Sequence, residues 1–192
     1  PYCLNENVIG TQDTSECDCG EDYIMIDDVC YYQSDLDVLQ DFIDQSGATI
    51  HMGMDKDADG IIQPREYGYQ TWKARRLTAL SWDNGDISGE IPESIGNLTH
   101  LASLDLWGGD LTGNLPESLE NLSNIVYLTL GGDFTGFIPE GIWNLTKLIR
   151  LSLFDGQLTG EIPPEVGNLD NLKKLDLAYN HLTGGIPAEI VK

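Results

Sequence analysis

The chain has 192 residues, and its 10 Lys and Arg against 32 Asp and Glu give a formal net charge of −22. This charge argues against nucleic acid or an anionic membrane surface as a partner, because both are bound through basic patches that displace counterions. No stretch approaches the roughly 20 apolar residues of a membrane-spanning helix, so the sequence predicts no membrane span. The chain begins at Pro1, without Met and without a signal-like apolar run, as expected of a processed product or a fragment.

Residues 1–33 form a cysteine-rich N-terminal segment that contains all the cysteines, Cys3, Cys17, Cys19 and Cys30. An even number in a Gly- and Asp-rich stretch favours disulfides over a zinc site, for which the C-D-C spacing is too tight. The stretch CDCGEDYIMIDDVC resembles the closing loop of an EGF-like module. That resemblance implies a Cys19–Cys30 disulfide, which leaves Cys3 to pair with Cys17. Disulfides indicate an oxidising, extracellular compartment.

Residues 34–76 are expected to form a helical cap. The stretch SDLDVLQDFIDQSG predicts a helix with Ser34 as N-cap, Asp37 at the third helical position and Gly47 at the end. One apolar stripe of this helix is expected to belong to the core, and it consists of Leu36, Leu39, Phe42 and Ile43.

The cap also contains a predicted calcium site at residues 55–66. Acidic residues, a glycine and a closing glutamate fall at the positions of an EF-hand loop, where the ligands are carboxylates and one backbone carbonyl. The expected ligands are Asp55, Asp57, Asp59, Ile61 and Glu66, and Gly60 makes the sharp turn. The alternative is a solvated acidic loop. Because the loop is single and the preceding ATIHMGM is predicted to be extended, Ca²⁺ is expected to tie the helix to the repeats rather than to act as a sensor.

A repeat occupies residues 77–192. Five units begin at Leu77, Leu101, Ile125, Leu148 and Leu172, with a period of 24 residues and one unit of 23. Within a unit, apolar residues at offsets 0, 3 and 5 predict a short strand with inward side chains. An L-T-G turn and an Ile-Pro or Leu-Pro pair follow, and a second apolar pair closes the coil. Since one coil cannot bury its own apolar face, the coils must stack, and their strands align in a parallel sheet.

The repeat resembles the plant-type leucine-rich repeat, L-x-x-L-x-L-x-x-N-x-L-T-G-x-I-P-x-x-I-G-N-L-x-x. The resemblance implies an α/β solenoid with short parallel strands on its concave face, and a protein that binds partners and catalyses nothing. Plant receptor ectodomains and inhibitors of pectin-degrading enzymes are among its members. The family's asparagine is present here only as Asn180, and its counterparts are Gly85, Gly109, Gly132 and Gly156. The turn is therefore expected to be satisfied by backbone or water.

The sequence does not suggest an enzyme. His51, His100 and His181 lie in no motif with a Ser or Cys nucleophile. Outward positions of the predicted sheet suggest a surface for a protein or carbohydrate ligand. This predicted binding surface consists of Trp107, Tyr127, Arg150, Phe154, Lys174 and Tyr179. The alternative is that its aromatic side chains merely pack on each other.

Two further predictions concern modification and assembly. Asn97, Asn121 and Asn144 each begin N-L-[ST], the acceptor of N-linked glycans, although the tripeptide also follows from the repeat consensus. The ending IPAEIVK supplies no cap for the last coil, which suggests a fragment or docking on another copy. Head-to-tail docking would build a fibre. We therefore expect an extracellular, secreted or cell-surface binding protein, with a structural subunit of a fibre as the alternative.

Overall fold

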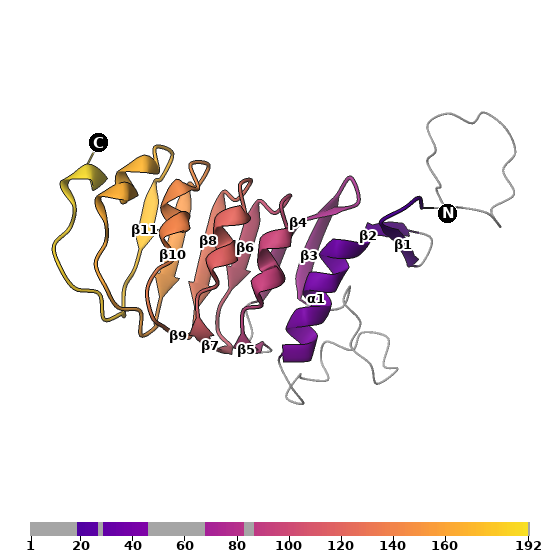
Figure 1. Ribbon diagram of the computed structural model, residues 1–192, viewed down its shortest axis with the longest axis horizontal. Helices are drawn as coiled ribbons and strands as arrows, with labels where there is room; N and C mark the ends of the chain where they lie inside the picture. Colours follow the sequence, from indigo (N-terminus) through magenta and orange to yellow (C-terminus); the bar gives the residue numbers. More distant parts are fainter. Residues whose placement is uncertain (1–18, 27–28, 46–67, 83–86, 192) are drawn as a thin grey trace, which may run out of the picture.

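The computed structural model describes residues 19–26, 29–45, 68–82 and 87–191. A small hairpin and one helix precede a stack of coils, and the N-terminal hairpin and the last coil lie at opposite ends (Figure 1). The predicted Cys3–Cys17 pair and the predicted calcium loop, residues 55–66, lie outside the described residues.

The N-terminal hairpin consists of β1 (Tyr23–Ile26) and β2 (Val29–Tyr32), which pair antiparallel. A disulfide joins Cys19 to Cys30, with 5.6 Å between the two Cα atoms. The predicted Cys19–Cys30 pairing is therefore confirmed, and it fastens the chain ahead of β1 to the second strand.

Helix α1 (Gln33–Gln45) follows β2 directly, and its apolar stripe is buried as predicted, with Ile43 at the margin. Its start differs from the prediction. The Gln33 N–H donates to the Asp22 carbonyl at 2.8 Å, so the helix begins before Ser34, and Ser34 is not its N-cap. Asp37 instead accepts a hydrogen bond from the Gln33 side chain at 2.7 Å.

A six-stranded sheet runs through the stack in the order β11-β10-β8-β6-β4-β3. Its strands are β3 (Tyr69–Lys73), β4 (Arg76–Trp82), β6 (Ser103–Leu106), β8 (Tyr127–Gly131), β10 (Arg150–Phe154) and β11 (Lys174–Asp176). From β4 onward every pairing is parallel and joins equal offsets of successive repeats, as the repeat predicts. Strand β3 pairs antiparallel with β4 through a tight turn at Ala74 and Arg75, both with positive φ.

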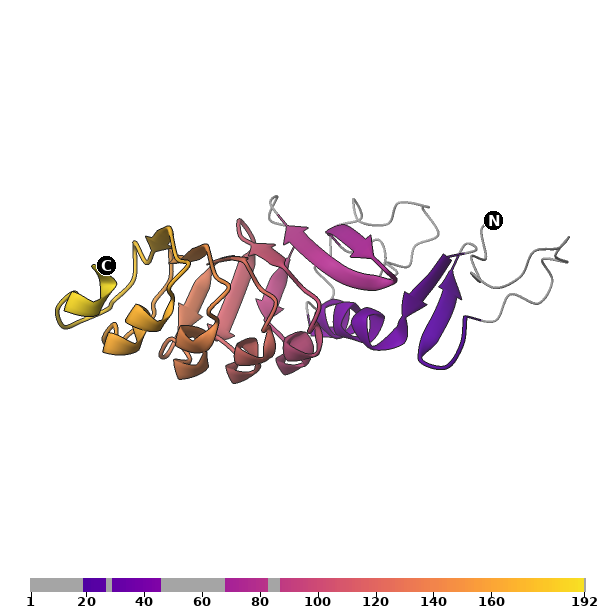
Figure 2. The same ribbon diagram turned by 90° about the horizontal axis from the view of Figure 1, so that it is seen from above.

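The opposite side of the stack carries 3-10 helices, one after each Ile-Pro or Leu-Pro pair (Figure 2). Proline suits this position because it lacks the N–H that a helix start leaves unpaired. The helices are η4 (Glu93–Asn97), η5 (Glu117–Asn121), η6 (Glu140–Asn144), η7 (Pro164–Asn168) and η8 (Ala188–Ile190). A second parallel sheet joins the first coils between these two sides, and it consists of β5 (Ser88–Glu90), β7 (Asp110–Asn114) and β9 (Asp133–Thr135).

The core lies between the six-stranded sheet and the 3-10 helices. Leu101, Leu104 and Leu106 point inward from the sheet, and Leu119 and Leu122 meet the core from the helix side; all five are fully buried. Burying one such side chain contributes about 1.5–3 kcal/mol, so the stacked leucines are the main source of stability. The predicted α/β leucine-rich solenoid is confirmed.

Glycine at the asparagine position lets neighbouring coils approach more closely than a residue with a side chain would allow. A Cβ on Gly109 would collide with the backbone carbonyl of Ile87, and this same carbonyl accepts the Asp110 N–H at 2.9 Å. Where the asparagine side chain is absent, backbone groups thus provide the hydrogen bonds of the turn. Asn180, in contrast, donates to the Leu153 carbonyl at 2.8 Å and accepts the Leu158 N–H at 3.1 Å.

The unit of 23 residues omits one left-handed residue. Gly108, Asp155 and Tyr179 stand at the same offset of their repeats, and each has positive φ. In the third unit Gly131 pairs with Phe154, and Gly132 follows at the asparagine position, so no residue takes the left-handed place. The deletion therefore falls in the turn and leaves the strand register intact.

Candidate functional site

One row of side chains crosses the outer face of the six-stranded sheet. Strand pairing places Ser103, Tyr127, Arg150 and Lys174 side by side on successive strands. Tyr127 is 46 % exposed, and Arg150 and Lys174 are also exposed. A tyrosine ring and two cations thus face solvent together on a chain of net charge −22.

The next outward row has shorter side chains, and all of them are polar. Ser152 is buried, and the Asp176 carboxylate lies 3.5 Å from the Lys174 ammonium. This exposed pair is screened by water and contributes little to stability. It does limit the directions in which Lys174 can reach, whereas Arg150 forms no ion pair among the described residues.

The aromatic members of the predicted surface divide into two kinds. A Cβ on Gly131 would lie 2.9 Å from the Phe154 ring and 3.2 Å from Trp107 Cβ, so both residues lie close to the glycine. Phe154 is half-buried there, while Trp107 remains 40 % exposed. Phe154 is therefore partly covered by packing on Gly131 rather than on another ring, and Trp107 offers a ring to a partner.

Tyr179 is the most exposed aromatic side chain on this side, at 81 %. Its φ of 58° lies in the left-handed region, which costs a non-glycine residue about 1–2 kcal/mol. Its carbonyl accepts the Gly156 N–H at 2.8 Å, which holds the turn. The same left-handed turn recurs at Gly108 and Asp155, so the backbone conformation belongs to the repeat, and the exposed ring is what distinguishes Tyr179.

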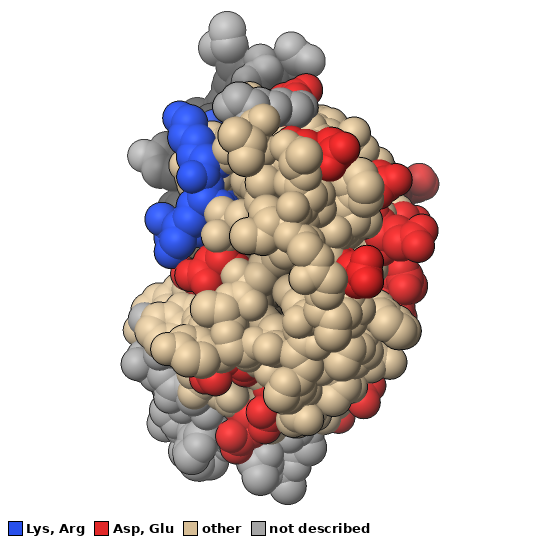
Figure 3. Space-filling model, turned by 90° about the vertical axis from the view of Figure 1, so that its left-hand side faces the viewer, with Lys and Arg blue, Asp and Glu red and all other residues tan. Residues whose placement is uncertain are grey.

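Charge is unevenly distributed between the two sides. Figure 3, which faces the C-terminal end, shows Lys and Arg gathered on the sheet side and many Asp and Glu on the side of the 3-10 helices. Each 3-10 helix begins with an acidic residue in its first turn, from Glu93 in η4 to Glu189 in η8. We name the sheet-side surface of Trp107, Tyr127, Arg150, Lys174 and Tyr179 the sheet face.

A buried ion pair joins the cap to the first repeat. The fully buried Asp35 carboxylate accepts hydrogen bonds from Arg76 Nε and Nη2, both at 2.9 Å, and from the Leu77 N–H at 2.8 Å. The Arg76 guanidinium also lies 4.0 Å from the centre of the Tyr32 ring. Hydrogen bonding to Asp35 raises the pKa of Arg76, and partial burial opposes that shift. The sequence prediction missed this clasp, although a carboxylate beside the apolar stripe of a helix was a signal for it.

The repeat geometry agrees with a family comparison. The model of a leucine-rich repeat region matches residues 70–192, which is more than half of the chain.

The chain is a leucine-rich-repeat protein.

Solved structures of plant leucine-rich-repeat proteins resemble this one. The BIR3–SERK2 complex from Arabidopsis thaliana is 31 % identical, with a TM-score of 0.66, over 80 % of this chain and 86 % of that chain. The ectodomain of the plant membrane receptor kinase GASSHO1/SCHENGEN3 from Arabidopsis thaliana, in complex with CASPARIAN STRIP INTEGRITY FACTOR 2, is 28 % identical, with a TM-score of 0.71. There the match covers 82 % of this chain and 19 % of that chain.

The plant peptide hormone receptor RGFR1, in complex with RGF2, is 42 % identical over 59 % of this chain and 18 % of that chain, with a TM-score of 0.57. This leucine-rich-repeat chain thus spans about a fifth of the length of the two receptors. A comparison with curated protein sequences found no match.

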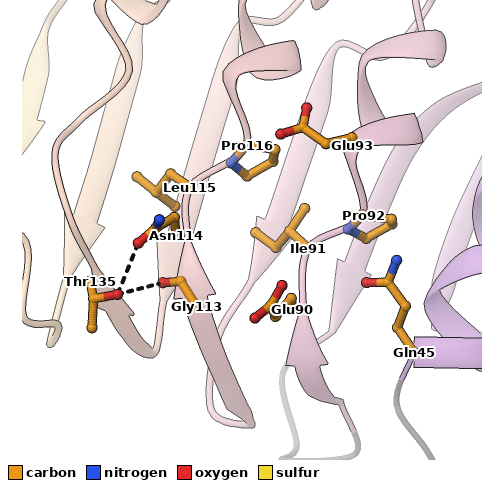
Figure 4. A pocket seen from close by; sticks show the side chains of 10 residues that line it. All are labelled: Gln45, Glu90, Ile91, Pro92, Glu93, Gly113, Asn114, Leu115, Pro116 and Thr135. Carbon is orange, nitrogen blue, oxygen red and sulfur yellow. Dashed lines mark hydrogen bonds between the residues drawn. The ribbon is translucent and has the colours of Figure 1, made fainter.

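A groove of about 520 Å³ lies on another side of this leucine-rich-repeat protein, between the end of α1 and the first three coils (Figure 4). Its polar groups connect neighbouring coils: the Glu93 carboxylate accepts the Ser118 N–H at 3.2 Å, and Thr135 Oγ1 donates to Asn114 Oδ1 at 2.9 Å. The lining consists of Gln45, Glu90, Ile91, Pro92, Glu93, Gly113, Asn114, Leu115, Pro116 and Thr135.

In the part of the chain that the structure describes, no group of three or more His, Cys, Asp or Glu could hold a metal ion. His100 and His181 are both exposed, and His51 lies outside the described residues. No helix among the described residues is long and apolar enough to cross a membrane.

Proposed function

We propose that the protein is an extracellular binding protein that recognises a protein segment on its sheet face. The observation that carries this proposal is the row in which Tyr127, Arg150 and Lys174 stand side by side and exposed. Aromatic and arginine side chains are the residues that contribute most to protein interfaces. Exposed Trp107 and Tyr179, which follow the ends of β6 and β11, add further apolar area.

The chemistry of the row selects the kind of partner. Arg150 and Lys174 favour Asp, Glu or a chain-terminal carboxylate, and the aromatic rings favour an adjacent apolar side chain. Net charge repels a uniformly acidic partner, so the matching segment carries few carboxylates and places them opposite this row. The similar receptor structures with RGF2 and with CASPARIAN STRIP INTEGRITY FACTOR 2 support a protein or peptide partner.

Peptide selection tests the proposal. A random twelve-residue peptide library displayed on phage is panned on the whole protein, and the dissociation constants of the selected peptides are measured by biolayer interferometry. We expect peptides enriched in Asp or Glu next to aromatic residues. Arg150→Glu should raise the dissociation constants of these peptides at least about tenfold, which corresponds to about 1.4 kcal/mol of binding free energy.

Lys73→Glu is the matched control, because Lys73 is equally a surface cation but lies on β3 at the other edge of the sheet. Both variants must keep the wild-type melting temperature. If Lys73→Glu weakens binding of the selected peptides as much as Arg150→Glu does, binding depends only on net charge. The proposed binding site would then be wrong. A carbohydrate ligand would instead depend on Trp107 and Tyr179 and tolerate Arg150→Glu.

We also propose that the loop of Asp55, Asp57, Asp59, Ile61 and Glu66 binds a structural Ca²⁺. The donor set fits, since three carboxylates, one carbonyl and a bidentate Glu are the oxygen ligands that Ca²⁺ takes. The loop lies between α1 and β3 in the chain, so a bound ion would fasten the connection between cap and sheet.

Calcium removal should lower the melting temperature by roughly 5–10 °C, because a ligand at about 100 times its dissociation constant stabilises by about 2.7 kcal/mol. Differential scanning fluorimetry with excess Ca²⁺ or with EGTA measures this change. Asp55→Asn with Glu66→Gln should remove the response, whereas Asp44→Asn, an exposed change on α1, should keep it. Equal melting temperatures with Ca²⁺ and with EGTA would refute the proposal.

A further inference from the structure

Three coils carry the tripeptide N-L-[ST] at the end of their 3-10 helix. Asn97, Asn121 and Asn144 are the last residues of η4, η5 and η6, and all three are exposed. Because successive coils stack in register, the three asparagines fall on one side of the solenoid. The repeat consensus alone explains why the tripeptide recurs. The local geometry therefore has to decide whether its asparagine can act as a glycan acceptor.

The tripeptides share one backbone conformation. Their central leucines have φ and ψ of −75° and 55° (Leu98), −74° and 56° (Leu122), and −80° and 69° (Leu145). The asparagine carbonyl accepts the N–H two residues later, at 2.8, 2.7 and 2.9 Å. These values describe an inverse γ-turn. The leucine points into the core, and the asparagine and the hydroxyl residue both remain exposed.

The fourth coil has the same turn with one chemical difference. Leu169 has φ and ψ of −80° and 65°, and the Asn168 carbonyl accepts the Asp170 N–H at 2.9 Å. Asn168 and Asp170 are exposed like their counterparts. Only the hydroxyl residue is missing, because a carboxylate takes its place. The chain therefore contains its own comparison for the effect of the hydroxyl.

We infer that Asn97, Asn121 and Asn144 carry N-linked glycans in a single ridge, and that Asp170 keeps the fourth coil bare. This inference rests on the extracellular setting proposed above. In the transfer, the asparagine Nδ2 forms a bond to the anomeric carbon of an oligosaccharide. The bond between that carbon and the diphosphate of its lipid carrier breaks, the diphosphate leaves, and the amide proton goes to solvent.

The glycan ridge lies on the side of the 3-10 helices, opposite the six-stranded sheet (Figure 2). It shields the acidic helix side over three coils and leaves the sheet face accessible to a partner. Asn121 needs one adjustment, because its Nδ2 lies 3.0 Å from the place of a Cβ on Gly96. Its amide must turn toward solvent to hold a sugar, and its exposure permits that rotation.

The test is a count of glycans on the whole protein secreted from a yeast host, by intact mass before and after peptide-N-glycosidase treatment. We expect three glycans on the wild type. Thr99→Ala, Ser123→Ala and Thr146→Ala should each remove one glycan while the asparagine stays. Asp170→Thr should add a fourth, because it completes the tripeptide in an unchanged turn.

Secreted wild type without glycans would overturn the inference, and so would a glycan at Asn168 in the wild type. Asp170→Thr that stays at three glycans would overturn the role assigned to Asp170. Asp170→Ala, which supplies no hydroxyl, must also stay at three, and a fourth glycan on it would contradict the same role. The glycan count is independent of peptide binding, so its failure is distinct from failure of the sheet face.

Discussion

At the scale of single residues, Asp35 shows how one buried charge connects two parts of the molecule. Its carboxylate has three hydrogen-bond donors, two from Arg76 and one from the Leu77 backbone. These bonds compensate for the loss of water around a fully buried anion. The clasp joins the helix that follows the disulfide hairpin to the strand that opens the repeats.

Asp35→Ala should lower the free energy of unfolding by about 3–5 kcal/mol, because it leaves the partly buried Arg76 without its counterion. Urea denaturation followed by circular dichroism measures the loss. Asp37→Ala, two residues away on the exposed side of α1, is the control and should cost less than about 1 kcal/mol. Equal losses for the two variants would show that the clasp does not stabilise the protein.

At the scale of elements, the repeat explains most of the sheet. Leucines at fixed offsets predicted strands of the right length and register, since each strand has to present the same residues to the core. The antiparallel strand β3 was not predicted, because it lies before the periodic region and its pairing depends on the turn at Ala74 and Arg75. The helix start was predicted two residues late, because its first N–H binds the distant Asp22 carbonyl.

The binding surface stays a prediction, and the structure bears only on the exposure and packing of its residues. Alternation along a strand correctly places Tyr127, Arg150 and Lys174 outside. It could not tell that Phe154 settles over Gly131, because that contact depends on a missing side chain in the neighbouring coil. The carboxylate of Asp35 beside the apolar stripe indicated a buried partner, but the sequence could not identify Arg76, which is 41 residues away.

The glycines of the L-T-G turns allow a prediction about the contacts between neighbouring coils. Gly160 has a φ of +93°, and a Cβ there would lie 2.8 Å from the Phe137 ring of the preceding coil. Gly160→Ala should therefore destabilise the protein by about 1–3 kcal/mol, through backbone strain and overpacking. Thermal denaturation measures the change.

Gly185→Ala is the matched control, because nothing lies within 4 Å of its Cβ position and its φ is not positive. It should leave the melting temperature almost unchanged. Adding Phe137→Ala to Gly160→Ala should recover the part of the lost stability that comes from overpacking against the Phe137 ring. If the two glycine variants melt alike, the tight contact between coils has no energetic weight.

At the scale of the whole molecule, the solenoid separates two surfaces of different charge. The helix side is acidic, and the sheet face carries the cations and the exposed rings (Figure 3). This separation favours an extended partner that crosses successive strands. It does not suggest a deep pocket for a small molecule. Head-to-tail assembly into a fibre stays a prediction, and it would use the ends of the solenoid rather than the sheet face.

The most direct measurement is a site-specific photo-crosslink. The photoreactive residue p-benzoylphenylalanine replaces Tyr127 on the sheet face or, in a separate variant, the exposed Glu117 at the start of η5. Each variant is irradiated with a peptide selected as described above, and the crosslinked product is quantified by mass spectrometry. We predict a crosslink from position 127 that unlabelled peptide competes away, and none from position 117. A crosslink from position 117 alone would contradict recognition by the sheet face.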